Sequence, residues 1–206
     1  TGAEMSWVRD GVEGDETAFM EIELAKEEDA VFLGSRSVSI KGIFEPWGSG
    51  VSCVDCLTAA KAYPASLKDP YLEEDSTFKI NVVSIGGQIG DVERTKTIQR
   101  CFEYIDFKGK VLMDQTRKGV RAGKGPRAAN QFWWLEDVGS PPHTAHAKGL
   151  VPHRRWFARE IALGQRHLLD HYDLKKRQYL CSTSMTAELS FLVANFAHCR
   201  PGTLML

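Results

Sequence analysis

The sequence predicts an α/β (α+β) protein. Two observations carry this prediction: short runs that alternate apolar and polar residues, as half-buried strands do, and longer runs whose apolar residues recur at helical spacing. Both kinds of run occur along the 206 residues, of which 43% are hydrophobic and 26% charged, an ordinary globular composition. No run of about 18 apolar residues is present, so we expect no membrane-spanning segment.

The first elements predict a strand–helix–strand series. Residues 17–24 and 38–44 alternate as strands do, and residues 26–34 fit a short helix with Gly34 as its C-terminal stop. This series looks like the latter part of a small ferredoxin-like unit. The turn-forming residues Pro46-Trp-Gly-Ser-Gly50 then predict a break and a domain boundary.

The middle of the chain predicts a second α/β unit. We expect a helix over residues 51–63, which Pro64 ends, and a strand over 76–83 with Phe78, Ile80 and Val82 on one face. A helix is predicted at 91–104 and another at 165–172, and further strands at 111–113, 131–135 and 155–163.

The last stretch predicts an amphipathic helix, because Leu189, Leu192, Val193 and Phe196 fall at i, i+3, i+4 and i+7. Pro201-Gly202 is expected to end this helix, and residues 204–206 to begin a buried strand. A single apolar half-strand cannot bury both of its faces. We therefore interpret the sequence as a piece of a longer protein.

The two halves of the chain carry opposite charge. Residues 1–106 contain 10 Lys/Arg against 20 Asp/Glu, a balance of −10, whereas residues 107–206 contain 16 against 7, a balance of +9, and all six histidines. We expect the second half to contact a polyanion; solvated charged faces are the alternative. The candidate nucleic-acid-binding residues are Arg117, Lys118, Arg121, Lys124, Arg127, Arg154, Arg155, Lys175, Lys176 and Arg177.

Residues 116–127 contain five of the cations and three glycines, and such glycines let the backbone approach phosphate. A flexible solubilising loop is an equal alternative. The spacing of Gly119, Gly123 and Lys124 does not match a P-loop, and Gly125 replaces its hydroxyl residue, so nucleotide hydrolysis is disfavoured. Arg159 forms a basic cluster with Arg154 and Arg155. Arg159 and Arg166 could instead be structural, each paired with a carboxylate such as Glu160 or Asp170.

Aromatic residues offer a second means of binding nucleic acid. Phe132, Trp133 and Trp134 could stack on unpaired bases. Adjacent strand residues point to opposite faces, so we favour the core for at least one face of this run. Trp47 could contact RNA or a domain interface, although packing remains the stronger expectation.

We expect no metal site. Cys53 and Cys56 have no second pair of ligands, which a four-ligand zinc site requires. His143 with His146, and His167 with His171, have metal-compatible spacing, but only Asp170 could supply an acidic ligand nearby in sequence. The five cysteines are scattered, as in proteins of a reducing compartment, so we expect a cytoplasmic location.

Several ordered motifs carry a family resemblance. Lys175-Lys-Arg-Gln-Tyr179, Thr183-Ser-Met185, Leu189-Ser-Phe191 and Ala194-Asn195 resemble the segment before the cofactor loop in the catalytic subunit of tRNA guanine-10 N2-methyltransferase. Further blocks resemble the same subunit in the same order: Gly42 to Gly50, Asp75 to Ile80, Phe107 to Val111, Leu135 to Asp137 and Gly164 to Arg166. The resemblance spans roughly residues 17–206.

The resemblance implies a domain organisation. We expect a partial ferredoxin-like unit over residues 1–48, a THUMP RNA-binding domain over 49–138, a linker region over 139–185, and the truncated start of a Rossmann-like methyltransferase domain over 186–206. The implied partner is tRNA, held by its acceptor stem and 3′ end. The implied cofactor of the full-length enzyme is S-adenosylmethionine, and none is expected on this fragment.

The resemblance also implies particular contacts. Thr183, Ser184 and Met185 lie close to the methyl donor in the family, and Thr186 replaces the usual Asp while keeping an oxygen that can cap the next helix. No catalytic residue is expected in this fragment. A small zinc-binding activator subunit is the expected partner of the full-length complex. The alternative is a stand-alone THUMP RNA-binding or assembly factor without enzymatic activity.

Overall fold

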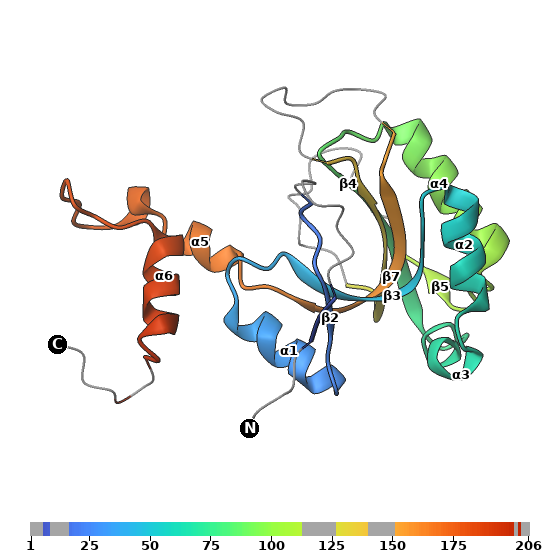
Figure 1. The fold of residues 1–206 in the computed structure, drawn as a ribbon, viewed down its shortest axis with the longest axis horizontal. Coiled ribbons are helices and arrows are strands. Elements are labelled where there is room, and N and C mark those ends of the chain that lie inside the picture. The colour runs from blue at the N-terminus through green and yellow to red at the C-terminus, as the bar shows by residue number, and fades with distance from the viewer. Residues whose placement is uncertain (1–5, 9–16, 113–126, 140–150, 200–201, 203–206) are drawn as a thin grey trace. The chain divides into compact units, whose positions relative to one another are not determined.

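The protein contains two compact units. The computed structural model describes residues 6–8, 17–112, 127–139, 151–199 and 202, the first three by their backbone alone. The larger unit is built from described residues within Met5–Glu23 and Phe44–Glu160. The smaller unit is built from Leu24–Ile43 and from the described residues from Ile161 onward. Figure 1 shows the ribbon with most of its helices and strands labelled.

A mixed five-stranded sheet in the order β3-β7-β6-β4-β5 organises the larger unit. Its strands are β3 (Gly42–Gly50), β4 (Thr77–Ile85), β5 (Lys110–Val111), β6 (Asn130–Asp137) and β7 (Arg154–Leu163). Strand β4 pairs in parallel with β5 and β6, and β6 pairs antiparallel with β7. A separate antiparallel pair joins β1 (Ser6–Val8) to β2 (Glu21–Glu23).

Helices cover one face of this sheet. These are α2 (Cys53–Ala62) and α4 (Asp91–Tyr104), with the short α3 (Ala65–Lys68) and the 3₁₀ turn η1 (Asp69–Tyr71) between α2 and β4 (Figure 1). Ser52 begins α2 with a capping box, because its hydroxyl accepts from the backbone N–H of Asp55 while the Asp55 carboxylate reaches back to Ser52. Parallel strands need a crossover connection, and α4 supplies it.

The core lies between the sheet and these helices. Phe78, Ile80 and Val82 of β4 are buried, as their alternation predicts. Phe132 and Trp134 are also buried, whereas Trp133 points to the other face, where its indole N–H donates to Glu160 Oε2 at 2.8 Å. The prediction that this aromatic run contributes to the core is confirmed. Trp47 is buried beside Phe132, with ring centroids 5.1 Å apart, so packing is also its role.

The glycine-rich segment 46–50 is a strand, so the prediction of a turn there is wrong. Strand β3 runs through it at the end of the sheet order, where Pro46 disturbs no second partner. Its glycines allow α2 to approach: a Cβ on Gly48 would lie 2.3 Å from the carbonyl oxygen of Cys56. Close helix–strand packing, rather than a change of direction, requires these small residues.

The smaller unit contains α1 (Glu27–Arg36), α5 (His167–His171), the 3₁₀ turn η2 (Leu174–Lys176) and α6 (Ala187–Phe196). The prediction that Gly34 stops α1 is wrong, because this glycine lies buried within the helix. A Cβ there would lie 2.9 Å from the Cβ of Ala162, so close packing accounts for this glycine. No helix among the described residues is long and apolar enough to cross a membrane.

Helix α6 ends earlier than Pro201-Gly202 predicts. Its carboxyl end is closed by two hydrogen bonds, from His198 N–H to Asn195 O at 3.1 Å and from Cys199 N–H to Ala194 O at 3.1 Å. His198 adopts φ 51°, the left-handed conformation that this Schellman arrangement needs. The buried strand predicted at 204–206 lies outside the described residues.

Candidate RNA-binding surface

The arginines of β7 mark the first candidate surface, and the structure places carboxylates beside them. Arg159 Nε donates to Glu45 Oε2 at 2.7 Å, and its guanidinium lies 4.0 Å from the centre of the Tyr71 ring. Glu45 also accepts from Trp47 Nε1 at 3.1 Å and from the Tyr63 hydroxyl at 2.9 Å. The structural role predicted for Arg159 is confirmed, although its partner is Glu45.

Burial and hydrogen bonding compete at this carboxylate. Burial alone raises the pKa of Glu45, but hydrogen bonds from Arg159, Tyr63 and Trp47 together with the positive charge of Arg159 hold it below its usual value of 4.5. The hydrogen bond between Tyr63 and Glu45 has the opposite effect on the phenol and raises its pKa. Burial, followed by the hydrogen bond to Glu45, raises the pKa of Tyr63 to about 12. Glu45 is therefore an anion that binds Arg159 at neutral pH.

Arg154 and Arg155, two predicted RNA contacts, also have carboxylate partners. Arg155 Nε donates to Glu136 Oε1 at 3.3 Å, and its Nη1 donates to the carbonyl of Val51. Arg154 Nη2 lies 3.5 Å from Glu21 Oε1 and 3.4 Å from Ser49 Oγ. A phosphate that contacts these guanidinium groups must share them with carboxylates.

Arg127 is far more exposed than the carboxylate with which it pairs. Its guanidinium pairs with Glu160, and the arginine side chain is 61% exposed while that of Glu160 is only 6% exposed. Much of the Arg127 side chain therefore remains accessible to an external anion. Arg117, Lys118, Arg121 and Lys124 lie outside the described residues.

The second candidate surface is the basic turn, residues Lys175, Lys176 and Arg177, in the smaller unit. Lys175 and Lys176 are exposed, and Arg177 is partly so. Asp173 begins η2 by accepting from the backbone N–H of Lys175 at 2.8 Å. The ammonium of Lys176 donates to the carbonyl of Asp170 near the end of α5, which neutralises the negative helix end. The turn presents cations to solvent, and the acceptor of the Lys176 ammonium is a backbone carbonyl.

The predicted cofactor contacts Thr183, Ser184 and Met185 form a turn before α6. Ser184 Oγ accepts from the backbone N–H of Cys181 at 3.0 Å, and Ser184 N–H donates to the Cys181 carbonyl at 3.0 Å. Thr186 Oγ1 caps α6 by accepting from Leu189 N–H at 3.4 Å, so the capping oxygen predicted there is present. The turn thus positions the start of α6.

Sequence reasoning missed Cys181 in this turn. Its exposed thiol lies 3.2 Å from Thr183 Oγ1 and 3.5 Å from Ser184 Oγ. Hydrogen bonds with these two hydroxyls lower the pKa of Cys181 to about 7, and the bond with Thr183 has the larger effect. The neighbouring Ser-Thr-Ser run is the signal that could have indicated a stabilised thiolate.

The cysteines and histidines provide no metal centre within the part of the chain that the structure describes, because no three His, Cys, Asp or Glu side chains gather there. Cys56 is buried under β3, and burial raises the pKa of its thiol to about 12. His143 and His146 lie outside the described residues.

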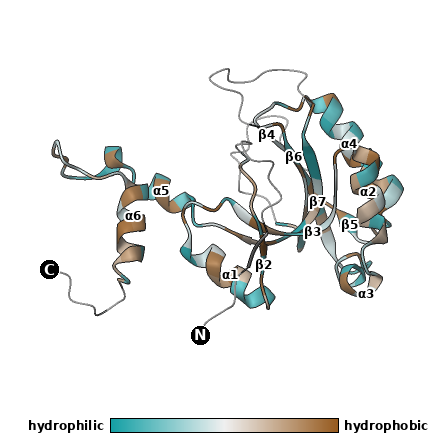
Figure 2. Cartoon of the chain, in the orientation of Figure 1, coloured by the Kyte–Doolittle hydropathy of each residue, from teal (hydrophilic) through white to brown (hydrophobic). Residues whose placement is uncertain are grey.

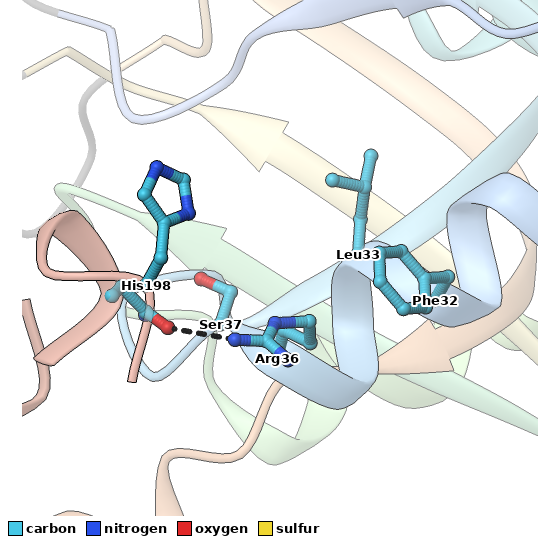
Figure 3. A pocket seen from close by; sticks show the side chains of 6 residues that line it. Phe32, Leu33, Arg36, Ser37 and His198 are labelled. Carbon is cyan, nitrogen blue, oxygen red and sulfur yellow. Dashed lines mark hydrogen bonds between the residues drawn. The ribbon is translucent and has the colours of Figure 1, made fainter. Parts of the chain in front are cut away.

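An open groove lies between α1 and the end of α6 in the smaller unit (Figure 3). Its volume is about 430 Å³. Phe32, Leu33 and Arg36 come from α1, and Arg36 Nη2 donates to Asn195 Oδ1 at 3.3 Å. Ser37 and His198 complete the lining. No prediction from the sequence included this groove, because its two helices are separated by about 150 residues of chain.

The architecture defines an α/β protein with a mixed sheet, helices on one face and an exposed basic turn. Comparison with known proteins identifies its family. Residues 12–166 match the family described as Tmrp11 THUMP N-terminal domain, and the chain belongs to this family. The resemblance found in the sequence motifs is confirmed.

Named proteins from other organisms are similar to most of this chain. The tRNA (guanine(10)-N(2))-methyltransferase TRMT11 of Gallus gallus is 35% identical over 187 residues, which cover 91% of this chain and 37% of that protein. The Homo sapiens protein of the same name is 36% identical over 177 residues, or 86% and 35% of the two chains. The Saccharomyces cerevisiae tRNA (guanine(10)-N(2))-methyltransferase is 31% identical over 188 residues, or 91% and 40%. The chain therefore spans well under half the length of these relatives.

Proposed function

We propose that this chain is the tRNA-binding part of an S-adenosylmethionine-dependent methyltransferase that N2-methylates guanine 10 of tRNA. The observation that carries the proposal is the match to a THUMP family together with relatives named for this reaction. The chain itself is catalytically incomplete in this proposal. It grips the acceptor stem and 3′ end, so that a catalytic domain can reach the target base, and such positioning can lower a reaction barrier by several kcal/mol.

The basic turn is the part of the proposed RNA surface that the structure supports most directly. Lys175 and Lys176 are exposed cations, and lysines of this kind bind phosphate as point charges. Arg127 supports the proposal through its exposed side chain. Arg154 and Arg155 contribute less charge, since Glu21 and Glu136 already compensate them.

The domain boundaries at 49, 139 and 186 remain part of the proposal. Helix α6 supports a further domain after residue 186, because its apolar residues Leu189, Leu192, Val193 and Phe196 are exposed, the last by 83%. Figure 2 shows hydrophobic colouring along this helix. Apolar side chains exposed together on one helix are typical of a surface that another domain or chain covers.

The proposed cofactor site includes Thr183, Ser184 and Met185. Their turn offers two hydroxyls and an exposed thioether side chain, which suit hydrogen-bonding and apolar contacts to a nucleoside. S-adenosylmethionine supplies an electrophilic methyl group when bound. We propose in addition a cytoplasmic location and a small zinc-binding activator subunit in the full-length complex; both rest on the family resemblance.

A salt-dependent tRNA titration tests the binding function. Changing Lys175, Lys176 and Arg177 together to Ala should lower affinity and reduce the slope of log K against log[salt] by roughly 0.9 per lost phosphate contact, by analogy with B-DNA. Changing Lys26 and Lys41 together to Ala is the control, because both cations are exposed and lie outside the predicted RNA-binding residues and the proposed THUMP domain. An unchanged slope in the first variant would assign the basic turn to structure alone.

The alternative function is a stand-alone THUMP RNA-binding or assembly factor. Both candidates predict tRNA binding, so methyl transfer separates them. Full-length protein, incubated with labelled S-adenosylmethionine and unmodified tRNA, should incorporate label at guanine 10 if the enzyme proposal holds. Binding without incorporation, in the presence of the activator subunit, would favour the alternative.

A further inference from the structure

The size and the lining residues of the groove between α1 and α6 indicate which kind of ligand it can bind. Its volume of about 430 Å³ lies within the range of roughly 300–1,000 Å³ typical of small-ligand sites. Both helices meet it with their carboxyl ends: Arg36 is the last residue of α1, and His198 follows the end of α6. Helix carboxyl ends carry partial negative charge, and the Arg36 guanidinium in the groove offsets it, so the groove favours a largely neutral ligand that can form hydrogen bonds.

The side chains of the groove suit a planar ring. Phe32 is 61% exposed and lines the groove beside Leu33, so one large aromatic surface is available for stacking (Figure 3). Arg36 and Asn195 are held together by their 3.3 Å hydrogen bond. Guanidinium and amide groups are the side chains that proteins use to hydrogen-bond purine edges. Stacking together with edge hydrogen bonds is the usual way of binding an unpaired base.

His198 adds an imidazole to the lining of the groove. Its φ of 51° closes α6 in a conformation for which glycine is the common residue. Protein stability alone would favour glycine there, yet this chain has an imidazole that lines the groove.

We propose that this groove binds one unpaired nucleobase of the RNA, stacked on Phe32 and hydrogen-bonded by Arg36 and Asn195, with His198 at its rim. The inference rests on the proposed RNA-binding function. It adds to the basic turn a base-binding site that acts through stacking, not through phosphate charge.

Binding of two RNA probes to the 206-residue chain tests the inference. The probes are a single-stranded RNA heptamer of mixed sequence and a blunt-ended RNA duplex whose bases are all paired. Phe32→Ala should weaken heptamer binding by roughly five- to 150-fold, the range for loss of one base–aromatic stack. It should leave the duplex affinity and the salt slope unchanged, because no phosphate contact is lost.

Two further variants separate binding from folding. Phe196→Ala removes another exposed phenylalanine, one that does not line the groove, so it should not change heptamer affinity. His198→Gly should maintain or raise the thermal stability of α6, since glycine suits its backbone, while it weakens heptamer binding.

The outcomes distinguish the inference from the function on which it rests. Equal heptamer affinity for wild type and Phe32→Ala overturns the base-binding site and leaves the proposed tRNA binding intact. An equal loss for Phe32→Ala and Phe196→Ala likewise overturns it, since the groove then has no special role. Wild-type protein that binds neither heptamer nor tRNA overturns both proposals.

Discussion

Arg159 and Glu45 join neighbouring strands of the sheet through a 2.7 Å ion pair, with Tyr71 stacked on the guanidinium. The Arg159 side chain is 8% exposed and that of Glu45 is 24% exposed, so water screens the pair only in part. Trp47 and Tyr63 complete the hydrogen bonds of the carboxylate. An arginine that looks like an RNA contact in the sequence therefore holds β3, β7 and the α2–β4 connection together.

Replacing Arg159 with Leu should destabilise the larger unit by about 2–4 kcal/mol. Removal of one partner from a buried pair leaves an uncompensated charge, and the partial exposure of Glu45 lowers the cost somewhat. Urea unfolding of the two proteins measures the difference. Arg94→Leu is the control, because Arg94 pairs with exposed Asp91 at 3.7 Å, and such pairs contribute less than about 1 kcal/mol. Equal effects of both variants would contradict a special role for Arg159.

The same pair predicts a pH dependence of stability. The folded-state pKa of Glu45 lies below its usual value of 4.5, so the unfolded chain takes up this proton first as pH falls. The contribution of Glu45 is therefore complete above about pH 4.5 and is lost as pH falls through the folded-state pKa. Urea midpoints measured from roughly pH 6 to 3 should fall more steeply for wild type than for Glu45→Gln, which cannot ionise. Parallel curves would exclude this carboxylate as a source of acid sensitivity.

Gly48→Ala should destabilise the larger unit by about 2–3 kcal/mol or more, because the new Cβ meets backbone atoms of α2 that cannot move independently. The contact would be 2.3 Å to Cys56 O and 2.4 Å to Ala60 N. Gly90→Ala is the matched control, since no atom lies within 4 Å of a Cβ at that position. Thermal unfolding of both variants should show a large loss for the first and a small change for the second; a small loss at Gly48 would contradict the close approach of α2.

Cys181 should be the most reactive thiol among the described residues. Its pKa of about 7 makes roughly half of it thiolate at neutral pH, whereas burial keeps Cys56 and Cys101 protonated. The rate of iodoacetamide alkylation, followed by peptide mass spectrometry, should rise through a midpoint near pH 7 at Cys181. The double variant Thr183→Val, Ser184→Ala should move this midpoint toward the ordinary value of 9.0. A midpoint that stays unchanged would show that these hydroxyls do not stabilise the thiolate.

Periodicity predicted most of the regular elements in this chain. The alternation of Phe78, Ile80 and Val82 indicated β4 and its buried face, and the helix predicted at residues 91–104 is α4. Glycine positions were interpreted less well. Gly34 and Pro46–Gly50 were expected to end elements, whereas the structure has them inside α1 and β3. A glycine can serve a turn or a close contact, and local sequence does not distinguish the two uses.

The sequence by itself determined the class of fold, the family and the uneven distribution of charge, because each depends on residue types and their spacing along the chain. Only the tertiary structure decided which cations remain available. Arg154, Arg155 and Arg159 meet Glu21, Glu136 and Glu45, from parts of the chain 19 to about 130 residues away, while Lys175 stays exposed. An electrostatic partner is set by distance in space, which sequence separation does not reveal.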